Sequence, residues 1–121
     1  MTQPVSAPRM YVDIPSPNQT ITQNVGITGW ALDQMSSSGP GVEAVHAWAY
    51  PTNGAAPIFI GASGIGNVRP DVGNYFGARF AGSGFSINGT LPRGDYTLVV
   101  FAFSSITRTF NQTVSIHVRV V

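Results

Sequence analysis

Two stretches of the chain, residues 42–50 and 95–104, carry apolar side chains on both faces of a predicted β-strand. Successive side chains of a strand point to opposite faces, so a strand with one buried face should alternate apolar and polar residues. In 42–50, one face is Val45, Ala47 and Ala49, and the other is aromatic: His46, Trp48 and Tyr50. In 95–104 the two sets are Tyr96, Leu98, Val100 and Ala102, and Thr97, Val99, Phe101 and Phe103. One of the two apolar faces must therefore be covered by the chain's own loop, by another copy of the protein or by a ligand.

Five further stretches are predicted to be strands from their spacing of apolar residues, at 9–14, 24–32, 57–63, 84–90 and 108–121. Short turns rich in Pro, Gly and Asn separate most of them, which favours an all-β, immunoglobulin-like two-sheet β-sandwich of about seven strands. In that arrangement the third, sixth and seventh strands share a sheet. Its outward side would carry His117 and the following set, which we name the aromatic face: His46, Trp48, Tyr50, Val99, Phe101 and Phe103.

The segment 64–80 breaks this alternation but is too apolar to lie free in water, so we expect an ordered insertion. Pro70 suits the first position of a helix, which predicts a short helical turn over 70–76. Trp30 is predicted to point away from the main core and to pack under the insertion. Residues 1–8 are expected to be a linker or frayed terminus, and residues 9–121 a single domain.

Composition narrows the classes of partner. Charged residues make up only 9% of the 121 positions, every basic residue is arginine, and the net charge is +1, which argues against binding of nucleic acid. Cysteine is absent, which excludes disulfides and thiolate sites, and no apolar run is long enough for membrane insertion. We therefore expect other protein copies, neighbouring domains or a polysaccharide as partners.

No catalytic or metal-binding pattern is present. The carboxylates lie mostly at predicted strand ends or turns, without an obvious cleft: Asp13, Asp33, Glu43, Asp71 and Asp95. Two histidines, His46 and His117, are too few for a typical zinc site. We predict no enzyme activity, no cofactor and no metal.

The Arg69-Pro70-Asp71 sequence allows two interpretations. It could be a ligand clamp or a calcium corner, but calcium needs several oxygen ligands and Asp71 has no acidic neighbour in sequence. We interpret it as a structural turn, in which Asp71 accepts backbone N–H groups or pairs with Arg69 or Arg79.

Several short motifs occur in a characteristic order between residues 25 and 120. They are Gly29-Trp30-Ala31-Leu32-Asp33, Gly41-Val42 with Val45, Gly61, Arg69-Pro70-Asp71-Val72 with Tyr75-Phe76, Ser83-Gly84-Phe85, and Gly94 with Tyr96, Thr97, Leu98 and Val100. In these the chain resembles a bacterial immunoglobulin-like module found beside cell-wall hydrolases and in surface proteins. The resemblance implies a secreted, non-catalytic accessory domain, usually one of several in a longer chain. The aromatic residues at 46–51 depart from the polar positions usual there, which weakens the case for a purely spacer role.

Three hypotheses remain for the aromatic face. The insertion 64–80 could fold over it, a protein could bind it, or a planar row of Trp48, Tyr50, Phe101 and Phe103 could stack on sugar rings. In the last case His46 or Arg119 could contact the hydroxyls. We expect a non-catalytic extracellular or cell-surface module for adhesion, self-assembly or spacing, with carbohydrate binding as the alternative and a small enzyme as the least favoured.

Overall fold

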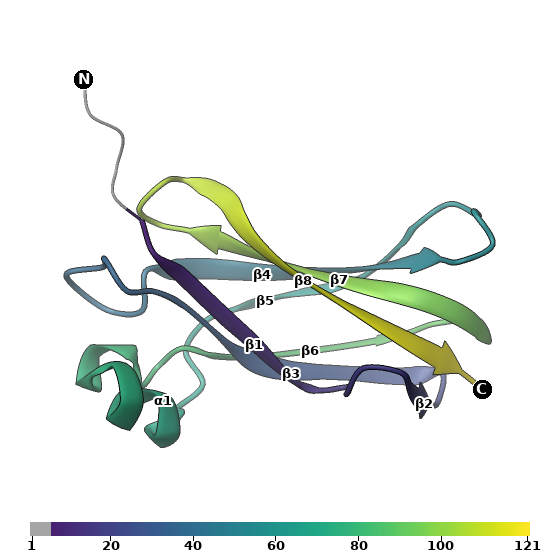
Figure 1. Cartoon of the computed structure of the whole chain (residues 1–121), viewed down its shortest axis with the longest axis horizontal. Helices are drawn as coiled ribbons and strands as arrows, with labels where there is room; N and C mark the ends of the chain where they lie inside the picture. The colour runs from purple at the N-terminus through teal and green to yellow at the C-terminus, as the bar shows by residue number, and fades with distance from the viewer. Residues whose placement is uncertain (1–5) are drawn as a thin grey trace.

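The computed structural model describes residues 6–121 and consists of two β-sheets packed face to face, with one short helix at one end (Figure 1). The elements are β1 (Pro8–Ile14), β2 (Gln19–Ile21), β3 (Asn24–Asp33), β4 (Val42–Pro51), β5 (Ile58–Gly64), α1 (Pro70–Phe76), a 3₁₀ helix (Ala78–Phe80), β6 (Gly84–Thr90), β7 (Gly94–Ser104) and β8 (Thr109–Val120). The predicted all-β sandwich is confirmed. Each predicted strand is present, and the predicted helical turn is α1.

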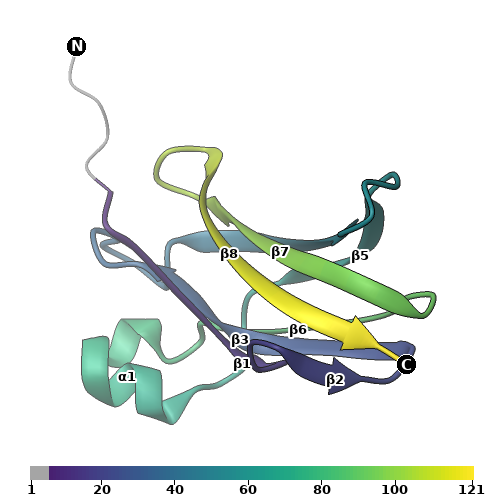
Figure 2. The same ribbon diagram turned by 45° about the vertical axis from the view of Figure 1, so that its right-hand side comes forward.

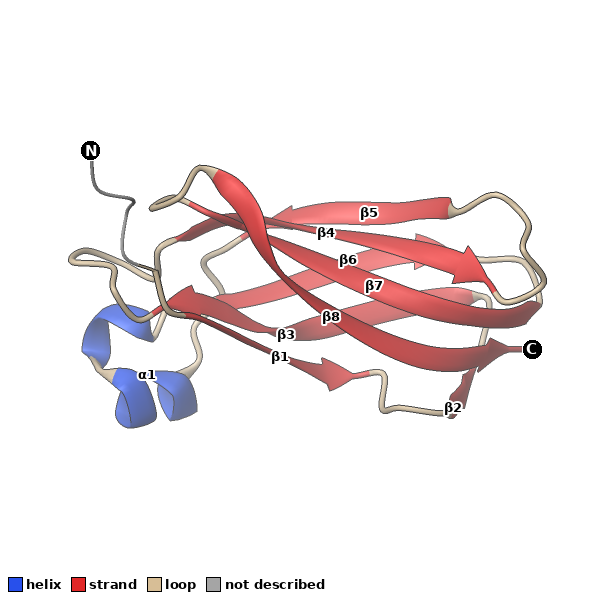
Figure 3. Cartoon of the chain, turned by 45° about the horizontal axis from the view of Figure 1, so that its top comes forward, coloured by secondary structure: helices blue, strands red, loops and turns tan. Residues whose placement is uncertain are grey.

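The strands form a three-stranded sheet of order β1-β3-β6 and a five-stranded sheet of order β2-β8-β7-β4-β5 (Figure 3). This is the immunoglobulin-like arrangement expected from the sequence, with β4, β7 and β8 in one sheet. The addition is β2, which pairs in parallel with β8. The chain therefore changes sheets between β1 and β2. A strand of three residues is too short to show alternation in a sequence.

The main core lies between the two sheets. It includes the inward residues of β4 and β7, which face those of the three-stranded sheet: Val45, Ala47, Ala49, Leu98, Val100, Ala102, Ile27, Phe85 and Ile87. Tyr96 is buried at the start of β7, and its hydroxyl donates a hydrogen bond to the carbonyl oxygen of Pro92 at 2.7 Å. This is the tyrosine corner of immunoglobulin-like sandwiches, and it fixes the turn that enters β7.

The N-terminal boundary of the fold lies earlier than the sequence predicts. The expected linker was 1–8, but Pro8 begins β1 and the backbone N–H of Ala7 donates to Asp33. The hydroxyl of Ser6 also donates to Asp33. These bonds attach residues 6–8 to the domain, whereas residues 1–5 lie outside the described part of the chain.

Helix α1 packs at one end of the three-stranded sheet, on its outer side (Figure 2). Leu32, Val72 and Phe80 form a second small core there, with Trp30 and Phe76 packed against it. The prediction that Trp30 lies under the insertion is therefore confirmed. The helix has no side-chain N-cap, so its stability comes from packing and from Pro70 at its first position.

Candidate functional site

The outward side of the five-stranded sheet carries the aromatic face. Along β4 the buried positions alternate with outward ones, so that the Trp48 indole lies away from the space between the sheets. The register places Trp48 opposite Val99 and His46 opposite Phe101 on β7. The outward orientation predicted for these side chains is confirmed. His117 of β8 is also outward, opposite Thr97.

Two phenylalanines that the sequence did not assign to this face, Phe59 and Phe110, extend it. Phe59 on β5 lies opposite Trp48, and Phe110 on β8 lies opposite Phe103. Simple alternation along β8 would place Phe110 on the same side as the buried Ile116. A register shift between Ala102 and Phe103, where β8 advances by an extra residue, turns Phe110 outward.

A similar register shift in the β4–β5 pairing, between Ala47 and Trp48, places Phe59 outward and lets Ile60 enter the core. A bulge inverts the alternation of every residue beyond it. Both phenylalanines lie within predicted strands, but their side of the sheet follows only from the paired register.

The rings of this face are tilted against one another. Neighbouring pairs among His46, Trp48, Phe59, Phe101, Phe103 and Phe110 have centroids 4.9–6.4 Å apart and interplanar angles of 54–83°. Edge-to-face contact is the favoured geometry for packed aromatic rings. The rings therefore form a tight cluster in which Phe59 and Phe110 pack edge-on against their neighbours.

The insertion 64–80 does not cover the aromatic face. Its helix packs on Leu32 and Trp30 of β3, which belongs to the other sheet. The hypothesis of coverage by this segment was therefore wrong, because strand periodicity cannot say to which sheet an insertion returns. The face instead keeps an open hollow of about 340 Å³, lined by His46, Trp48, Phe101, Phe110 and Thr113.

Ion pairs lie at the margins of the face. At the β8 start, Arg108 pairs with Glu43, and its guanidinium lies 5.2 Å from the centre of the Phe103 ring. At the other end, Arg119 pairs with Asp95 at 3.0 Å, and this hydrogen bond lowers the pKa of Asp95. The charged side chains at the margins of the aromatic face are thus paired, and its centre consists of aromatic rings.

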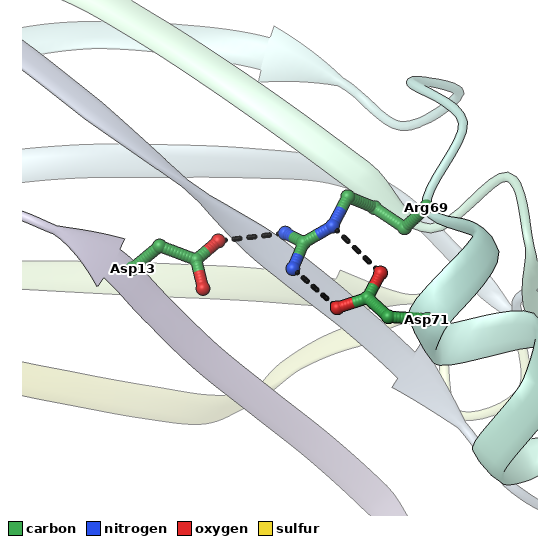
Figure 4. A network of polar contacts seen from close by, with 3 residues as sticks. All are labelled: Asp13, Arg69 and Asp71. Carbon is green, nitrogen blue, oxygen red and sulfur yellow. Dashed lines mark hydrogen bonds and ion pairs between the residues drawn. The ribbon is translucent and has the colours of Figure 1, made fainter.

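Arg69 joins the insertion to β1 (Figure 4). Its guanidinium donates to both carboxylate oxygens of Asp71, at 3.1 and 2.9 Å, and to Asp13 at 2.6 Å. Hydrogen bonds to Asp71 and Asp13 raise the pKa of Arg69, and the same bond to Arg69 lowers the pKa of Asp71. The pairing of Asp71 with Arg69 agrees with its interpretation as a structural turn. A guanidinium occupies the position between two carboxylates at which the calcium interpretation would need an ion.

Asp33, the last residue of β3, is fully buried. Its Oδ1 accepts hydrogen bonds from the backbone N–H groups of Ala7 and Met35, at 2.9 and 3.0 Å. Its Oδ2 accepts from the hydroxyl of Ser6 and lies 3.5 Å from the hydroxyl of Ser104. Asp33 is therefore a structural hub that ties the N-terminal segment and the loop after β3 to the end of β7.

Within residues 6–121, no three or more His, Cys, Asp or Glu side chains gather so as to hold a metal ion. In the same residues, no helix is both long and apolar enough to span a membrane.

Comparisons with known proteins give the chain no family. No family model matches the sequence, and no curated protein matches it. Domains 4 and 5 of the S-layer protein SbsC share 13% identity with it, with a TM-score of 0.44 and coverage of 98% of this chain and 54% of that one. A hypothetical protein from Pyrococcus horikoshii shares 11% identity, with a TM-score of 0.49 and coverage of 95% and 89%. The chain thus spans about half the length of the SbsC structure, and at these scores neither likeness indicates a function.

Proposed function

We propose that this domain is a non-catalytic module of a secreted or cell-surface bacterial protein, and that its aromatic face binds a second copy of the domain. The observation that carries the proposal is the uncovered ring cluster on the five-stranded sheet. Large apolar patches on a protein surface are typical of interaction sites. The secreted, bacterial setting is supported by the resemblance of its sequence motifs to immunoglobulin-like modules of surface proteins.

The exposed apolar area of this face sets the free energy available for self-association. Tyr50, Phe59 and Phe110 are 41%, 47% and 43% exposed. An aromatic residue carries about 200 Å², so each of the three leaves roughly 80–95 Å² in water. Burying that area contributes about 2 kcal/mol per ring at ~25 cal/mol per Å². A stable interface takes about 800 Å² from each partner, so the three rings would form its centre and the half-buried neighbours its remainder.

The chemistry of the face favours protein over sugar. Its centre is mostly phenylalanine, which has no polar atom to bind a hydroxyl, and its rings lie at steep angles to one another. Protein interfaces concentrate aromatic residues at a centre depleted of charge, with polar residues at the rim. The ion pairs Glu43–Arg108 and Asp95–Arg119 lie at such a rim.

The non-catalytic part of the proposal is supported by the carboxylates. Asp13 and Asp71 bind Arg69, Glu43 binds Arg108, and Asp95 binds Arg119. The fifth, Asp33, is buried among backbone and hydroxyl donors. Each carboxylate thus has a structural partner, which is typical of groups that hold a fold together.

Sedimentation velocity over a concentration series tests the proposal. Wild-type protein should associate as its concentration rises, and Phe59→Glu should remain monomeric because it places a charge in the apolar centre. Both copies carry Phe59→Ala, so two rings are lost from a symmetric contact. Association should weaken about 1,000-fold, for roughly 2 kcal/mol per ring. Tyr75→Glu, on the opposite side of the molecule, is the matched control and should associate like wild type.

A wild-type protein that stays monomeric at millimolar concentration would contradict self-association and leave a spacer module. Association that persists in Phe59→Glu but is lost in the control would place the contact on the other sheet.

A further inference from the structure

We propose that a second aromatic group, where β1, β3 and α1 meet, is a carbohydrate site that takes the pyranose rings of an oligosaccharide. It is formed by Tyr11, Trp30 and Tyr75, with the polar side chains Arg9 and Gln34 beside them. It lies on the sheet opposite to the aromatic face, so it stands independently of the proposed self-association.

Two rings of this group, Tyr11 and Trp30, have nearly parallel planes, and two, Tyr11 and Tyr75, are largely exposed. Tyr11 and Trp30 lie opposite each other on β1 and β3, with centroids 6.5 Å apart and planes inclined by only 28°. Tyr11 is 58% exposed, and Tyr75 is 83% exposed at the end of α1. The C–H faces of a pyranose ring stack on exposed aromatic planes such as these.

The group is concave as well as aromatic. Two hollows, of about 370 and 400 Å³, share Trp30, Tyr75 and Phe76 in their linings. The first also reaches Asp71 and the second reaches Arg9. Adjoining hollows that share a wall of rings suit a ligand built of successive rings, of which an oligosaccharide is the simplest kind.

Hydrogen-bonding groups stand beside the rings. The Nε of Arg9 donates to Oε1 of Gln34 at 3.0 Å. That bond uses one of five guanidinium N–H groups of Arg9 and leaves the amide nitrogen of Gln34 as a donor. Arg9 and Gln34 can therefore keep their mutual hydrogen bond and still donate to sugar hydroxyls. The site thus offers a sugar both kinds of contact that it needs, an aromatic plane for its C–H face and a few polar groups that fix its orientation.

The site is held rigid from beneath. Phe76 packs 5.5 Å from Trp30 and 4.7 Å from Tyr75, between ring centroids, and it also contacts Phe80 in the small core. Arg69 fixes the start of α1 to β1 through Asp13. A preorganised site loses little conformational entropy when a ligand binds.

Isothermal titration calorimetry with cellohexaose, chitohexaose and maltohexaose tests the site. At least one of these should bind, and Tyr75→Ala should weaken that binding about tenfold or more, equivalent to about 1.4 kcal/mol. Tyr75→Phe should retain it because the ring is kept, and Arg9→Ala should weaken it with the rings intact. Tyr50→Ala, on the aromatic face, is the matched control and should bind like wild type. Tyr11→Ala, at the other exposed ring of the site, is a second test of stacking.

The proposal is overturned if none of the three sugars binds at millimolar concentration, or if Tyr75→Ala and Tyr11→Ala bind as wild type does. Loss of binding in Tyr50→Ala alone would move sugar recognition to the aromatic face and also overturn it. Loss of self-association in Tyr75→Ala, without a sugar effect, would assign these rings to a protein contact instead.

Discussion

Replacement of Asp33 should destabilise the domain strongly, because this carboxylate is fully buried and serves several donors. In Asp33→Ala the backbone N–H groups of Ala7 and Met35 lose their acceptor. A hydrogen bond to a charged group contributes about 1.5–3 kcal/mol, so the two bonds together set an upper range of roughly 3–6 kcal/mol. Removing a buried charge recovers part of that loss. We expect a net decrease of roughly 2–4 kcal/mol in the free energy of unfolding.

Asp33→Asn separates geometry from charge. Its Oδ1 can still accept both backbone N–H groups, and its amide nitrogen can donate to the hydroxyl oxygens of Ser6 and Ser104. The expected loss is about 1 kcal/mol, the scale of one altered hydrogen bond. Asp95→Ala removes an exposed carboxylate and serves as the control with little effect.

Urea unfolding, followed by tryptophan fluorescence and circular dichroism, measures both variants. The dependence of the unfolding free energy on urea concentration should stay the same, while the urea concentration at half-unfolding falls. Equal losses in Asp33→Ala and Asp33→Asn would show that the charge matters rather than the acceptor geometry. A loss below about 1 kcal/mol in Asp33→Ala would refute the hub, because even one hydrogen bond to a charged acceptor contributes about 1.5–3 kcal/mol.

Two further predictions concern the turns. Tyr96→Phe removes the hydrogen bond to Pro92 and should lower the unfolding free energy by about 1 kcal/mol, measured by urea unfolding; no change would mean that the ring alone holds the corner. The pKa of Asp71 lies below its ordinary value of 3.8 because Arg69 donates to it. Its ionised form therefore stabilises the fold above that pH, and the stabilisation is lost as pH falls through the lower folded-state pKa. The difference in unfolding free energy between wild type and Asp71→Asn, measured by urea unfolding, should shrink as pH drops from about 5 to about 2. A difference that does not change with pH would contradict this pairing.

Local pattern was enough to predict most of the fold. Alternation along β4 and β7 predicted both the strands and the outward direction of His46, Trp48 and Phe101, because side-chain direction in a strand has a strict period of two. Pro70 likewise predicted the start of α1, since its fixed backbone angle suits a first helical turn.

The candidate sites depended on information that a single strand does not carry. Phe59 and Phe110 reach the aromatic face only through register shifts, which are properties of paired strands. The second aromatic group, Tyr11, Trp30 and Tyr75, joins residues from three separate elements. Sequence periodicity indicated that Trp30 would lie under the insertion, but not that the Tyr11 ring would lie beside it.

By itself the sequence determined the class of fold, the strands and the surplus of rings, because these depend on neighbouring residues and on overall composition. The tertiary structure decided where the insertion lies, which rings meet, and that each carboxylate has a partner. Those outcomes depend on strand register and on contacts between residues distant in the chain, such as Asp13 with Arg69. Such contacts are set by packing the two sheets together, and no local pattern encodes them.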